Sequence, residues 1–319
     1  MTMKIIPILL SAILCTNAFA SPRTFVSAAS GNDLNPCSRT SPCRSFAGAL
    51  AVTDADGEII VVDSGGYGPV TIAQSVSIVS PAGIYAGVTV MSGVGIVINA
   101  GDTGRVVLRN LALIAQGTAT SAIDADTVST LSIENCTISG FTTNGILFDP
   151  TTANSSLAVT RTIIRNIPSI GINITGGSQS TNGATATIDS VHLYDCRTGV
   201  FVTYALASIS NTIAAGGLDN GYFAYIGSKV SVSESVATNN GTGFTAGFGF
   251  MMVSRCEATS NTTGIGAYEF GVIDVSDSTI ALNTTGLYEE ALTVISSRGN
   301  NTLQANTTDG AFNQSYSAQ

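Results

Sequence analysis

The ionisable side chains best suited to catalysis gather around the single histidine of this 319-residue chain. His192 lies in a short segment of alternating apolar residues, 188–194, with Asp189 on the same predicted strand and Arg161 and Arg165 on the preceding one. A histidine near a carboxylate can act as a general base, and arginines can hold an anionic sugar. These four residues form the candidate catalytic group. Asp189 and His192 would stand about 10 Å apart on an extended strand, so the alternative is a surface histidine without a role.

A second candidate group is aromatic. Phe223, Tyr225 and Tyr268 follow a repeated glycine in successive segments, Phe201 and Tyr288 continue the series, and we expect several of these rings to point outward. Rings in a row along a groove stack against the faces of pyranose sugars. We therefore predict that Phe223, Tyr225 and Tyr268 bind carbohydrate. The alternative is that the rings cover the wall of the fold or form an interface with a partner.

The cysteines divide into two kinds. Cys37 and Cys43 flank a polar, proline-containing loop and are close enough in sequence to form a disulfide in an oxidising compartment. Cys136, Cys196 and Cys256 lie in segments of alternating apolar residues, where we expect small buried side chains. None of these three has a neighbouring histidine or a CxxC spacing, so no metal site is predicted.

The remaining charged residues are interpreted as structural. Glu234, Arg255 and Asp277 alternate in sign along one predicted outward column, as a charge ladder requires. Asp124 and Asp126 are assigned to a turn. A site for acid/base catalysis would instead bring like charges together and separate their pKa values. The full predicted column is Asn110, Asn135, Arg161, Ser190, Asn211, Glu234, Arg255 and Asp277.

These side chains are carried by a short segment that recurs along the chain. A strand pattern such as residues 132–138 is followed by Gly and an apolar residue, and copies recur roughly every 21 to 29 residues. Asn-Thr-Thr-Gly, or a close variant, marks the corner at residues 261–264, 283–286 and 306–310. Asn and Gly tolerate left-handed backbone, and stacked Asn side chains can form hydrogen bonds along a solenoid. Each copy is too short to bury its own apolar face, so we predict a coiled parallel β-solenoid.

Composition excludes several classes of protein. The chain is 44% hydrophobic and only 10% charged, with 34 glycines and a net charge of −9. Disorder requires low hydrophobicity, and a coiled coil requires charged heptads, so neither fits. The 12 Lys and Arg residues are outnumbered by 21 Asp and Glu residues, which leaves no basic surface for nucleic acid or an anionic membrane.

The first 20 residues have the pattern of a signal peptide. Lys4 supplies a positive start, residues 5–15 form an apolar run too short to span a bilayer, and residues 18–20 form a small-x-small cleavage site. No later stretch has the pattern of a membrane span. We therefore predict a secreted, periplasmic or cell-surface protein.

The N-terminal part of the mature chain supports a family resemblance. A strand at residues 24–27, the Cys37/Cys43 loop, a short helical stretch at about 45–53 and the strand pattern at 57–62 follow in order. With the repeats, the chain resembles the right-handed parallel β-helix proteins of the pectin-lyase-like superfamily, specifically small secreted bacterial members of unassigned activity. The resemblance implies an all-β, right-handed, single-stranded parallel β-helix with a short N-terminal cap helix. It divides the chain into a signal peptide (1–20), a strand, disulfide loop and cap helix (21–56) and the β-helix (57–319).

The catalytic patterns of that superfamily are absent from the sequence. A polygalacturonase-like site needs adjacent aspartates, Gly-His-Gly and Arg-Ile-Lys, whereas His192 stands between Val191 and Leu193. A pectate-lyase-like site needs clustered carboxylates for calcium and a basic residue, and the mature chain has one lysine, Lys229. We predict no cofactor, and calcium binding stays open.

These observations lead to three alternative functions. The first is a secreted or surface β-helix module that binds carbohydrate or supports adhesion without catalysis. The second is a polysaccharide lyase or glycoside hydrolase that acts on an acidic polysaccharide. The third is a structural spike or coat protein, for which a stable trimer would be the sign. The expected partner is a polysaccharide or surface glycan, and the sequence does not identify the sugar.

Overall fold

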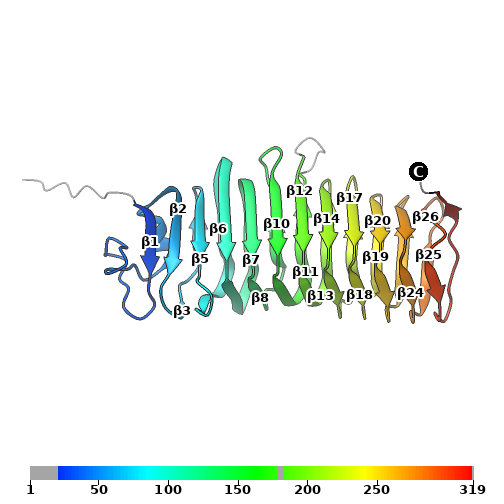
Figure 1. The fold of residues 1–319 in the computed structure, drawn as a ribbon, viewed down its shortest axis with the longest axis horizontal. Helices are drawn as coiled ribbons and strands as arrows, with labels where there is room; N and C mark the ends of the chain where they lie inside the picture. Colours follow the sequence, from blue (N-terminus) through cyan, green and yellow to red (C-terminus); the bar gives the residue numbers. More distant parts are fainter. Residues whose placement is uncertain (1–20, 178–182, 318–319) are drawn as a thin grey trace, which may run out of the picture.

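The computed structural model describes residues 21–177 and 183–317. The predicted signal peptide, residues 1–20, lies outside the described residues. Across the described part, the chain winds into a parallel β-solenoid of about 11 turns, with its strands side by side along the long axis (Figure 1). Every pairing between its strands is parallel, as when Ala207 faces Val230 and Val230 faces Met251 in successive turns. The predicted parallel solenoid is therefore confirmed.

Each turn contributes to three sheets, which are called sheets 1, 2 and 3 in chain order. The strands of sheet 1 are β1 (Ser21–Val26), β2 (Thr53–Val61), β5 (Val76–Val79), β10 (Ser156–Thr160), β12 (Thr185–Asp189), β14 (Leu206–Ser210), β17 (Lys229–Ser233), β20 (Phe250–Ser254), β23 (Val272–Ser276), β26 (Val294–Ser297) and β28 (Gln314–Ser315). Those of sheet 2 are β3 (Gly65–Gly66), β8 (Thr137–Ser139), β15 (Ile213–Ala215), β18 (Val236–Thr238), β21 (Glu257–Thr259), β24 (Thr279–Ala281) and β27 (Thr302–Gln304). Those of sheet 3 are β4 (Val70–Ile72), β9 (Asn144–Phe148), β16 (Asn220–Ala224), β19 (Thr242–Gly247), β22 (Thr263–Tyr268) and β25 (Thr285–Glu289).

Four long strands continue around the corners between sheets. Strands β6 (Ala86–Arg109) and β7 (Leu111–Glu134) take part in all three sheets. Strands β11 (Ile163–Thr175) and β13 (His192–Thr203) take part in sheets 2 and 3.

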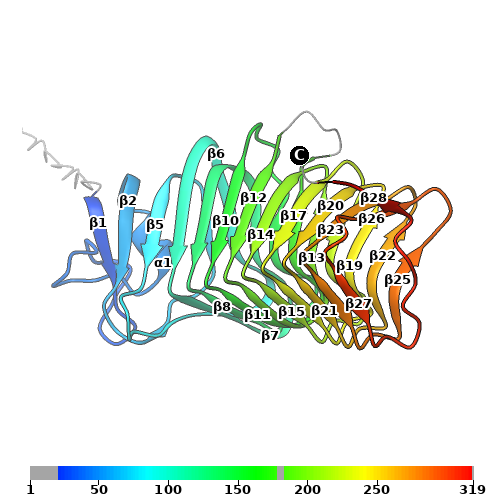
Figure 2. The ribbon, with the colours of Figure 1, turned by 45° about the vertical axis from the view of Figure 1, so that its right-hand side comes forward.

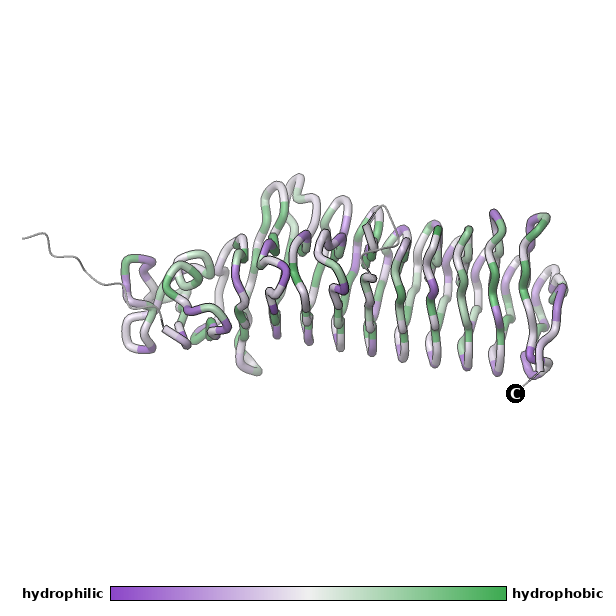
Figure 3. The backbone as a smooth tube through the Cα atoms, turned by 90° about the horizontal axis from the view of Figure 1, so that it is seen from above, coloured by the Kyte–Doolittle hydropathy of each residue, from purple (hydrophilic) through white to green (hydrophobic). Residues whose placement is uncertain are grey.

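The interior of the coil is filled by the inward side chains of every strand. Hydrophobic and hydrophilic residues alternate along each turn (Figure 3), and the inward set is mainly Ile, Val, Leu and Ala. Larger rings stack in the same way, with the centroids of Tyr222 and Phe244 5.1 Å apart. Cys136, Cys196 and Cys256 are free and buried in this core, as predicted.

The corner between sheets 1 and 2 corrects one prediction. The column expected to face outward from a strand instead supplies one residue per turn in left-handed conformation. A single left-handed residue turns the chain sharply, and here Arg, Glu and Ser adopt it as well as the more tolerant Asn and Asp. The charge ladder forms in part: Arg255 Nε lies 3.0 Å from Glu234 Oε1, while Asp277 accepts a hydrogen bond from Asn300. The positive φ angles are those of Asn110 (58°), Asn135 (51°), Arg161 (48°), Ser190 (56°), Asn211 (49°), Glu234 (50°), Arg255 (52°) and Asp277 (51°).

The corner between sheets 2 and 3 contains the predicted ladder of asparagines. The Oδ1 atom of Asn261 accepts hydrogen bonds from the backbone N–H and the side-chain Nδ2 of Asn240, at 2.9 and 3.2 Å. Asn283 and Asn306 repeat these contacts in the next turns. The left-handed residue, however, is the one that precedes each ladder asparagine. These residues are Asn239, Ser260, Leu282 and Ala305, and Gly216 has the same conformation one turn earlier, before Gly217.

The repeated glycine that follows this ladder has a steric role. Gly221, Gly243 and Gly264 do not have a positive φ. A Cβ on Gly243 would lie 2.6 Å from the carbonyl oxygen of Gly264 in the next turn, and the other two meet the same obstacle at 2.7 Å. The expectation that these glycines provide left-handed backbone is therefore wrong: close approach of successive turns excludes a side chain there.

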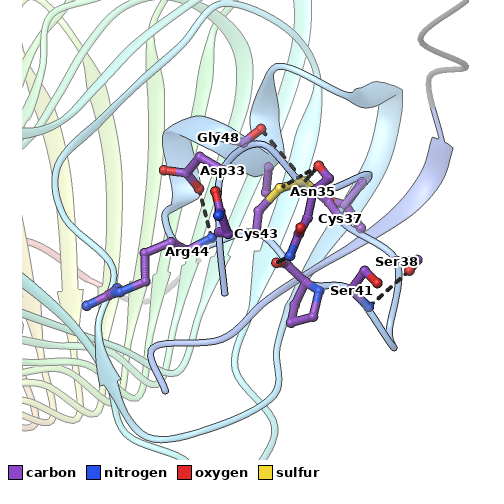
Figure 4. Close-up of a disulfide and its surroundings, with 12 residues drawn as sticks. Asp33, Asn35, Cys37, Ser38, Ser41, Cys43, Arg44 and Gly48 are labelled. Carbon is purple, nitrogen blue, oxygen red and sulfur yellow. Dashed lines mark hydrogen bonds between the residues drawn. A yellow bond between two sulfur atoms is a disulfide. The ribbon is translucent and has the colours of Figure 1, made fainter. Parts of the chain in front are cut away.

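The N-terminal part of the described chain contains a disulfide loop and the only helix of the described residues. The predicted disulfide Cys37–Cys43 is present, with both cysteines fully buried (Figure 4). Helix α1 (Phe46–Leu50) lies within the predicted stretch 45–53, and the Oγ atom of Ser45 accepts a hydrogen bond from Gly48 N. That this helix caps the coil stays a prediction. Within the described residues, no helix has the length and apolarity to cross a membrane.

Candidate functional site

The outward face of sheet 3 carries a column of residues, one from each turn, which only Gly266 leaves without a side chain. Strand pairing places them in register, with an acidic residue toward the N-terminal end and aromatic residues toward the C-terminal end. Figure 2 shows β19, β22 and β25 of this sheet side by side. The column consists of Val97, Asp124, Leu147, Asn173, Phe201, Phe223, Thr245, Gly266 and Tyr288.

Five rings form a row of contacts, which we call the aromatic row. It runs from Phe201 and Phe223 on this face to Phe248 and Phe270 at the corner that leads to sheet 1. Phe201 and Phe223 have ring centroids 5.3 Å apart, and the centroids of Phe223 and Tyr225 are also 5.3 Å apart. The row continues from Tyr225 to Phe248 at 6.5 Å and from Phe248 to Phe270 at 5.6 Å. Two predicted binding residues, Phe223 and Tyr225, therefore lie together in it.

Sequence reasoning missed Phe248 and Phe270. Both have positive φ, 51° and 67°, a conformation that sequence patterns do not associate with a bulky residue. The available signal was their equivalent position in successive turns, two residues before Phe250 and Val272, which pair in sheet 1.

Tyr268, the third predicted aromatic residue, lies apart from the aromatic row. Its ring centroid is 5.3 Å from that of Tyr288, and its ring covers Gly266, where a Cβ would lie 2.7 Å from Cε2. Burial raises the pKa of the Tyr268 hydroxyl. Gly247 occupies the position between Tyr225 and Tyr268 in their column, so within the described chain no ring contact joins the two tyrosines.

The histidine group is divided by the corner between sheets 1 and 2. Asp189 ends β12 and His192 begins β13, and left-handed Ser190 turns the chain between them. The Asp189 carboxylate accepts hydrogen bonds from Asn211 Nδ2 (2.9 Å), Ser210 Oγ (2.7 Å) and Ser190 Oγ (2.9 Å). These bonds, that of Asn211 first, hold the pKa of Asp189 below its usual range. Asp189 is thus a satisfied corner residue.

The partners of His192 are different from those predicted. Its Nδ1 lies 3.3 Å from the Tyr194 hydroxyl, and among the described residues no hydrogen bond joins it to Asp189. Arg165 pairs with Tyr194 from the preceding turn, whereas Arg161 lies at the corner and donates its backbone N–H to Asp189 O at 3.1 Å. Of the four residues, a direct contact therefore joins only Arg161 and Asp189, and within the described chain no hydrogen bond places the histidine against a carboxylate.

A cluster of carboxylates on sheet 3 corrects the assignment of two aspartates to a turn. Asp124 and Asp126 lie within strand β7, and Asp149 follows β9 one turn later. With Asn99 they surround a hollow of about 220 Å³. Burial raises the pKa of Asp124, as do the charges of Asp126 and Asp149. Burial and the charge of Asp126 also raise the pKa of Asp149. We call these three residues the acidic trio.

A second hollow, of about 470 Å³, adjoins the aromatic row. Its lining includes Phe201, Phe223, Arg197, Asp219 and Asn220. Arg197 Nε lies 2.7 Å from Asp219 Oδ2, which forms an ion pair beside the two rings. The sequence contains both residues, but only the register of neighbouring turns brings them together.

The carboxylates of the described residues bear on calcium, which the resemblance left open. Calcium requires six to eight oxygen ligands at about 2.3–2.6 Å. Within residues 21–177 and 183–317, no group of three or more His, Cys, Asp or Glu residues converges closely enough to hold a metal ion. The acidic trio is therefore considered below without a metal.

Comparison with known proteins identifies the fold. No protein-family model matches the chain, and no curated protein matches its sequence. Pectate lyase Pel9A is 14% identical, with a TM-score of 0.61 over 94% of this chain and 80% of that enzyme. Tailspike protein 2 of the Escherichia coli O157:H7 bacteriophage CAB120 is 11% identical, with a TM-score of 0.60 over 80% of this chain and 40% of the tailspike. XylC in complex with xylose is 9% identical, with a TM-score of 0.53 over 86% of this chain and 68% of XylC.

These low identities show similarity of fold alone. The chain has the parallel β-helix fold of these proteins, so the fold that the resemblance implied is confirmed.

Proposed function

We propose that this protein binds carbohydrate along the outward face of sheet 3, over the aromatic row, and does so without catalysis. The observation that carries the proposal is the unbroken series of ring contacts from Phe201 to Phe270. Aromatic rings bury a large area against a sugar at low conformational cost. A pectate lyase and a xylose complex among the solved structures of this fold support a carbohydrate ligand.

The alternative, that the rings only cover the wall of the coil, is less consistent with their exposure. Phe248 and Phe270 keep 46% and 57% of their surface accessible, and Tyr288 keeps 43%. Side chains that served only to cover the wall would themselves be covered by a loop.

Replacing Phe223 and Tyr225 together by alanine should lower glycan affinity about tenfold to a hundredfold. Each ring contact contributes about 0.5–1.5 kcal/mol beyond its buried area, and 1.4 kcal/mol corresponds to a factor of ten. Isothermal titration calorimetry against a panel of purified oligosaccharides measures this change. Tyr268→Ala should have a smaller effect, because Tyr268 lies outside the aromatic row.

Tyr85→Ala is the matched control for this experiment. Tyr85 is 48% exposed and its ring covers Gly87 on another part of the coil, as that of Tyr268 covers Gly266. Its replacement should leave glycan affinity unchanged. Equal affinities of the wild-type protein and the Phe223/Tyr225 variant would place the binding face elsewhere.

A second candidate function, glycoside hydrolysis, is favoured by the acidic trio. Glycosidases use two carboxyl groups, one protonated and one ionised, and neighbouring carboxylates with raised pKa values supply that difference. Asp124 shares its column with Phe201 and Phe223 of the aromatic row, so one glycan chain lying along the sheet would reach both. Mass spectrometry of the products tests this function. Oligosaccharides released by the wild-type protein, but not by Asp124→Asn or Asp149→Asn, would support it. If His192→Ala abolished product release and the aspartate variants did not, the catalytic site would instead be at His192.

Asp124→Asn should also raise the melting temperature at pH 7, by about 1–2 °C. Because the pKa of Asp124 in the folded state is raised above its ordinary value of 3.8, its protonated form stabilises the fold at low pH. That stability is lost as the pH rises through the folded-state pKa, and asparagine avoids the loss. The gain is small because solvent screens a partly exposed group. The melting temperature of the variant should differ from that of the wild-type protein at pH 7 and not at pH 3. The substitution Glu257→Gln, at an exposed residue, serves as control.

We also propose that the protein functions outside the cytoplasm and that α1 closes the N-terminal end of the coil. The buried disulfide Cys37–Cys43 supports the first proposal, because such bonds persist in oxidising compartments. For the second, Phe46 of α1 is fully buried and stacks on Tyr67 at 5.1 Å.

A further inference from the structure

We propose that the hollow beside Phe201 and Phe223 binds one pyranose ring of a neutral glycan, with the Arg197–Asp219 ion pair holding its hydroxyl groups. This inference rests on the proposed function and specifies both the position of one sugar and the class of glycan. It follows from the geometry of the ion pair, from the groups that the pair leaves available, and from the charge of sheet 3.

The backbone fixes the ion pair in place. Arg197 belongs to β13, at the start of its sheet 3 portion, and Asp219 immediately precedes β16 in the next turn. The Asp219 N–H donates to Arg197 O at 2.8 Å, so the two residues are joined through backbone as well as side chains. The pair therefore presents a preorganised polar edge to the hollow, which reduces the entropy lost when a ligand binds.

The ion pair leaves several polar atoms available for a ligand. Only Nε of Arg197 and Oδ2 of Asp219 take part in it. Within the described chain, the terminal nitrogens of Arg197 and Oδ1 of Asp219 have no hydrogen-bond partner. Asn220 Oδ1 accepts a hydrogen bond from Thr245 Oγ1 at 2.6 Å, which orients the amide and leaves its Nδ2 group to donate.

These available atoms match the hydroxyl groups of a sugar. Each sugar hydroxyl can both donate and accept, so neighbouring hydroxyls pair with guanidinium donors and a carboxylate acceptor at once. Phe201 and Phe223 line the same hollow and supply apolar ring surface for the C–H face of the sugar. A flat ring with polar edges is the ligand that satisfies both parts of the lining.

The charge of sheet 3 favours a neutral glycan. Asp124, Asp126, Asp149 and Asp219 face this side of the coil. Among the described segments that form sheet 3, Arg197 is the only Lys or Arg, and Asp219 neutralises its charge. The arginines of β6 and β11 lie in the parts of these strands that belong to sheets 1 and 2. An acidic polysaccharide would meet uncompensated negative charge along its length, and the total charge of −9 adds to this repulsion. The acidic substrate considered from the sequence is therefore disfavoured for this face.

The test measures binding by the full-length mature protein with isothermal titration calorimetry at low salt. The neutral probes are cellohexaose and xylohexaose, and the acidic probe is hexagalacturonate. We expect the wild-type protein to bind at least one neutral probe and not the acidic one. Arg197→Gln and Asp219→Asn should each lower that affinity about tenfold to a hundredfold, as expected for hydrogen bonds to charged groups. Asp219→Asn should also increase binding of hexagalacturonate, because it removes a negative charge.

The Arg255–Glu234 ion pair provides the matched control. Its side chains are 56% and 51% exposed, close to the 56% and 45% of Arg197 and Asp219, but it lies at the corner between sheets 1 and 2. Arg255→Gln and Glu234→Gln should leave all affinities unchanged. Thermal melts of each variant check that the fold is retained, which half-exposed side chains of this kind allow.

The possible outcomes separate this inference from the proposed function. Neutral binding that is lost in the Phe223/Tyr225 variant but unchanged in Arg197→Gln and Asp219→Asn would overturn the inference and keep the function. Preference of the wild-type protein for hexagalacturonate would overturn the neutral class alone. Absence of binding to all three probes, with the fold intact, would overturn both.

Discussion

Replacing Asn261 by alanine should lower the free energy of unfolding by about 4 kcal/mol. Asn261 is only 3% exposed, and its amide makes four hydrogen bonds in the ladder between sheets 2 and 3. Its Nδ2 group donates to Ala237 O at 2.9 Å and to Asn283 Oδ1 at 3.1 Å. Alanine removes the side-chain acceptor of the buried Asn240 N–H. It also removes one of two partners from Asn240 Nδ2 and from Asn283 Oδ1, which keep Ala214 O and the Asn261 N–H. Each buried unsatisfied group costs about 1–3 kcal/mol.

The loss should be concentrated near the substitution. Each turn of a solenoid contacts only its neighbours, so unfolding need not be all-or-none, and a single free energy can hide a local opening. Hydrogen exchange read by mass spectrometry should show lost protection first in β18, β19, β21 and β22, with denaturant titration giving the total change.

Asn239→Ala is the matched control for Asn261→Ala. Asn239 is an exposed asparagine with φ of 55° that directly precedes the ladder residue Asn240. Its replacement should cost only about 1 kcal/mol for the left-handed backbone. Similar losses for the two variants would mean that burial of the amide is not the source of the effect.

Replacing Gly243 by alanine should destabilise the coil by about 3 kcal/mol. The added Cβ would lie 2.6 Å from the carbonyl oxygen of Gly264, 3.1 Å from Asn261 Nδ2 and 3.2 Å from the Cβ of Ala237. The closest of these atoms belongs to backbone held in the sheet by hydrogen bonds, so it cannot move away without weakening them. Denaturant titration measures the change in stability.

Gly66→Ala separates this steric effect from the general cost of replacing glycine. A Cβ at Gly66 would meet its nearest atom, Gly87 O, at 3.9 Å, and its φ is not positive. We expect the Gly66→Ala variant to unfold at the same denaturant concentration as the wild-type protein. If Gly243→Ala were equally stable, successive turns at this corner would have to be farther apart than the structure places them.

The fold was predictable because it depends on spacing along the chain. Apolar alternation, the Asn-Thr-Thr-Gly corner and the recurring glycine all repeat with the turn, and each reports a local requirement of the coil. The location of Cys37 beside Cys43 is local in the same sense, and the structure joins them. Where the physical role was misassigned, as for the glycines of sheet 3, the position in the turn was still correct.

The candidate site was less predictable because it depends on register between turns. Asp124 and Asp149, or Arg197 and Asp219, belong to different turns and meet only through strand pairing. The grouping of Asp189 with His192 failed for a related reason: the left-handed residue at Ser190 interrupts the alternation that sequence reasoning extended through it. Phe223 lies in β16 and Tyr225 directly follows that strand. They were found because residues two apart in an extended segment share a face without any assumption about neighbouring turns.

The recurring turn also makes the length of the binding face a quantity that can change by whole units. Residues 240–260 run from one ladder asparagine to the residue before the next. They include one left-handed corner of each kind, the ladder glycine Gly243 and one strand of each sheet. Duplication of such a stretch in the gene would lengthen the coil by about 4.8 Å, and each turn would still pack against a turn of the same kind. A face built in this way can grow to contact more units of a polymeric ligand, and the gain in avidity needs no new contact chemistry.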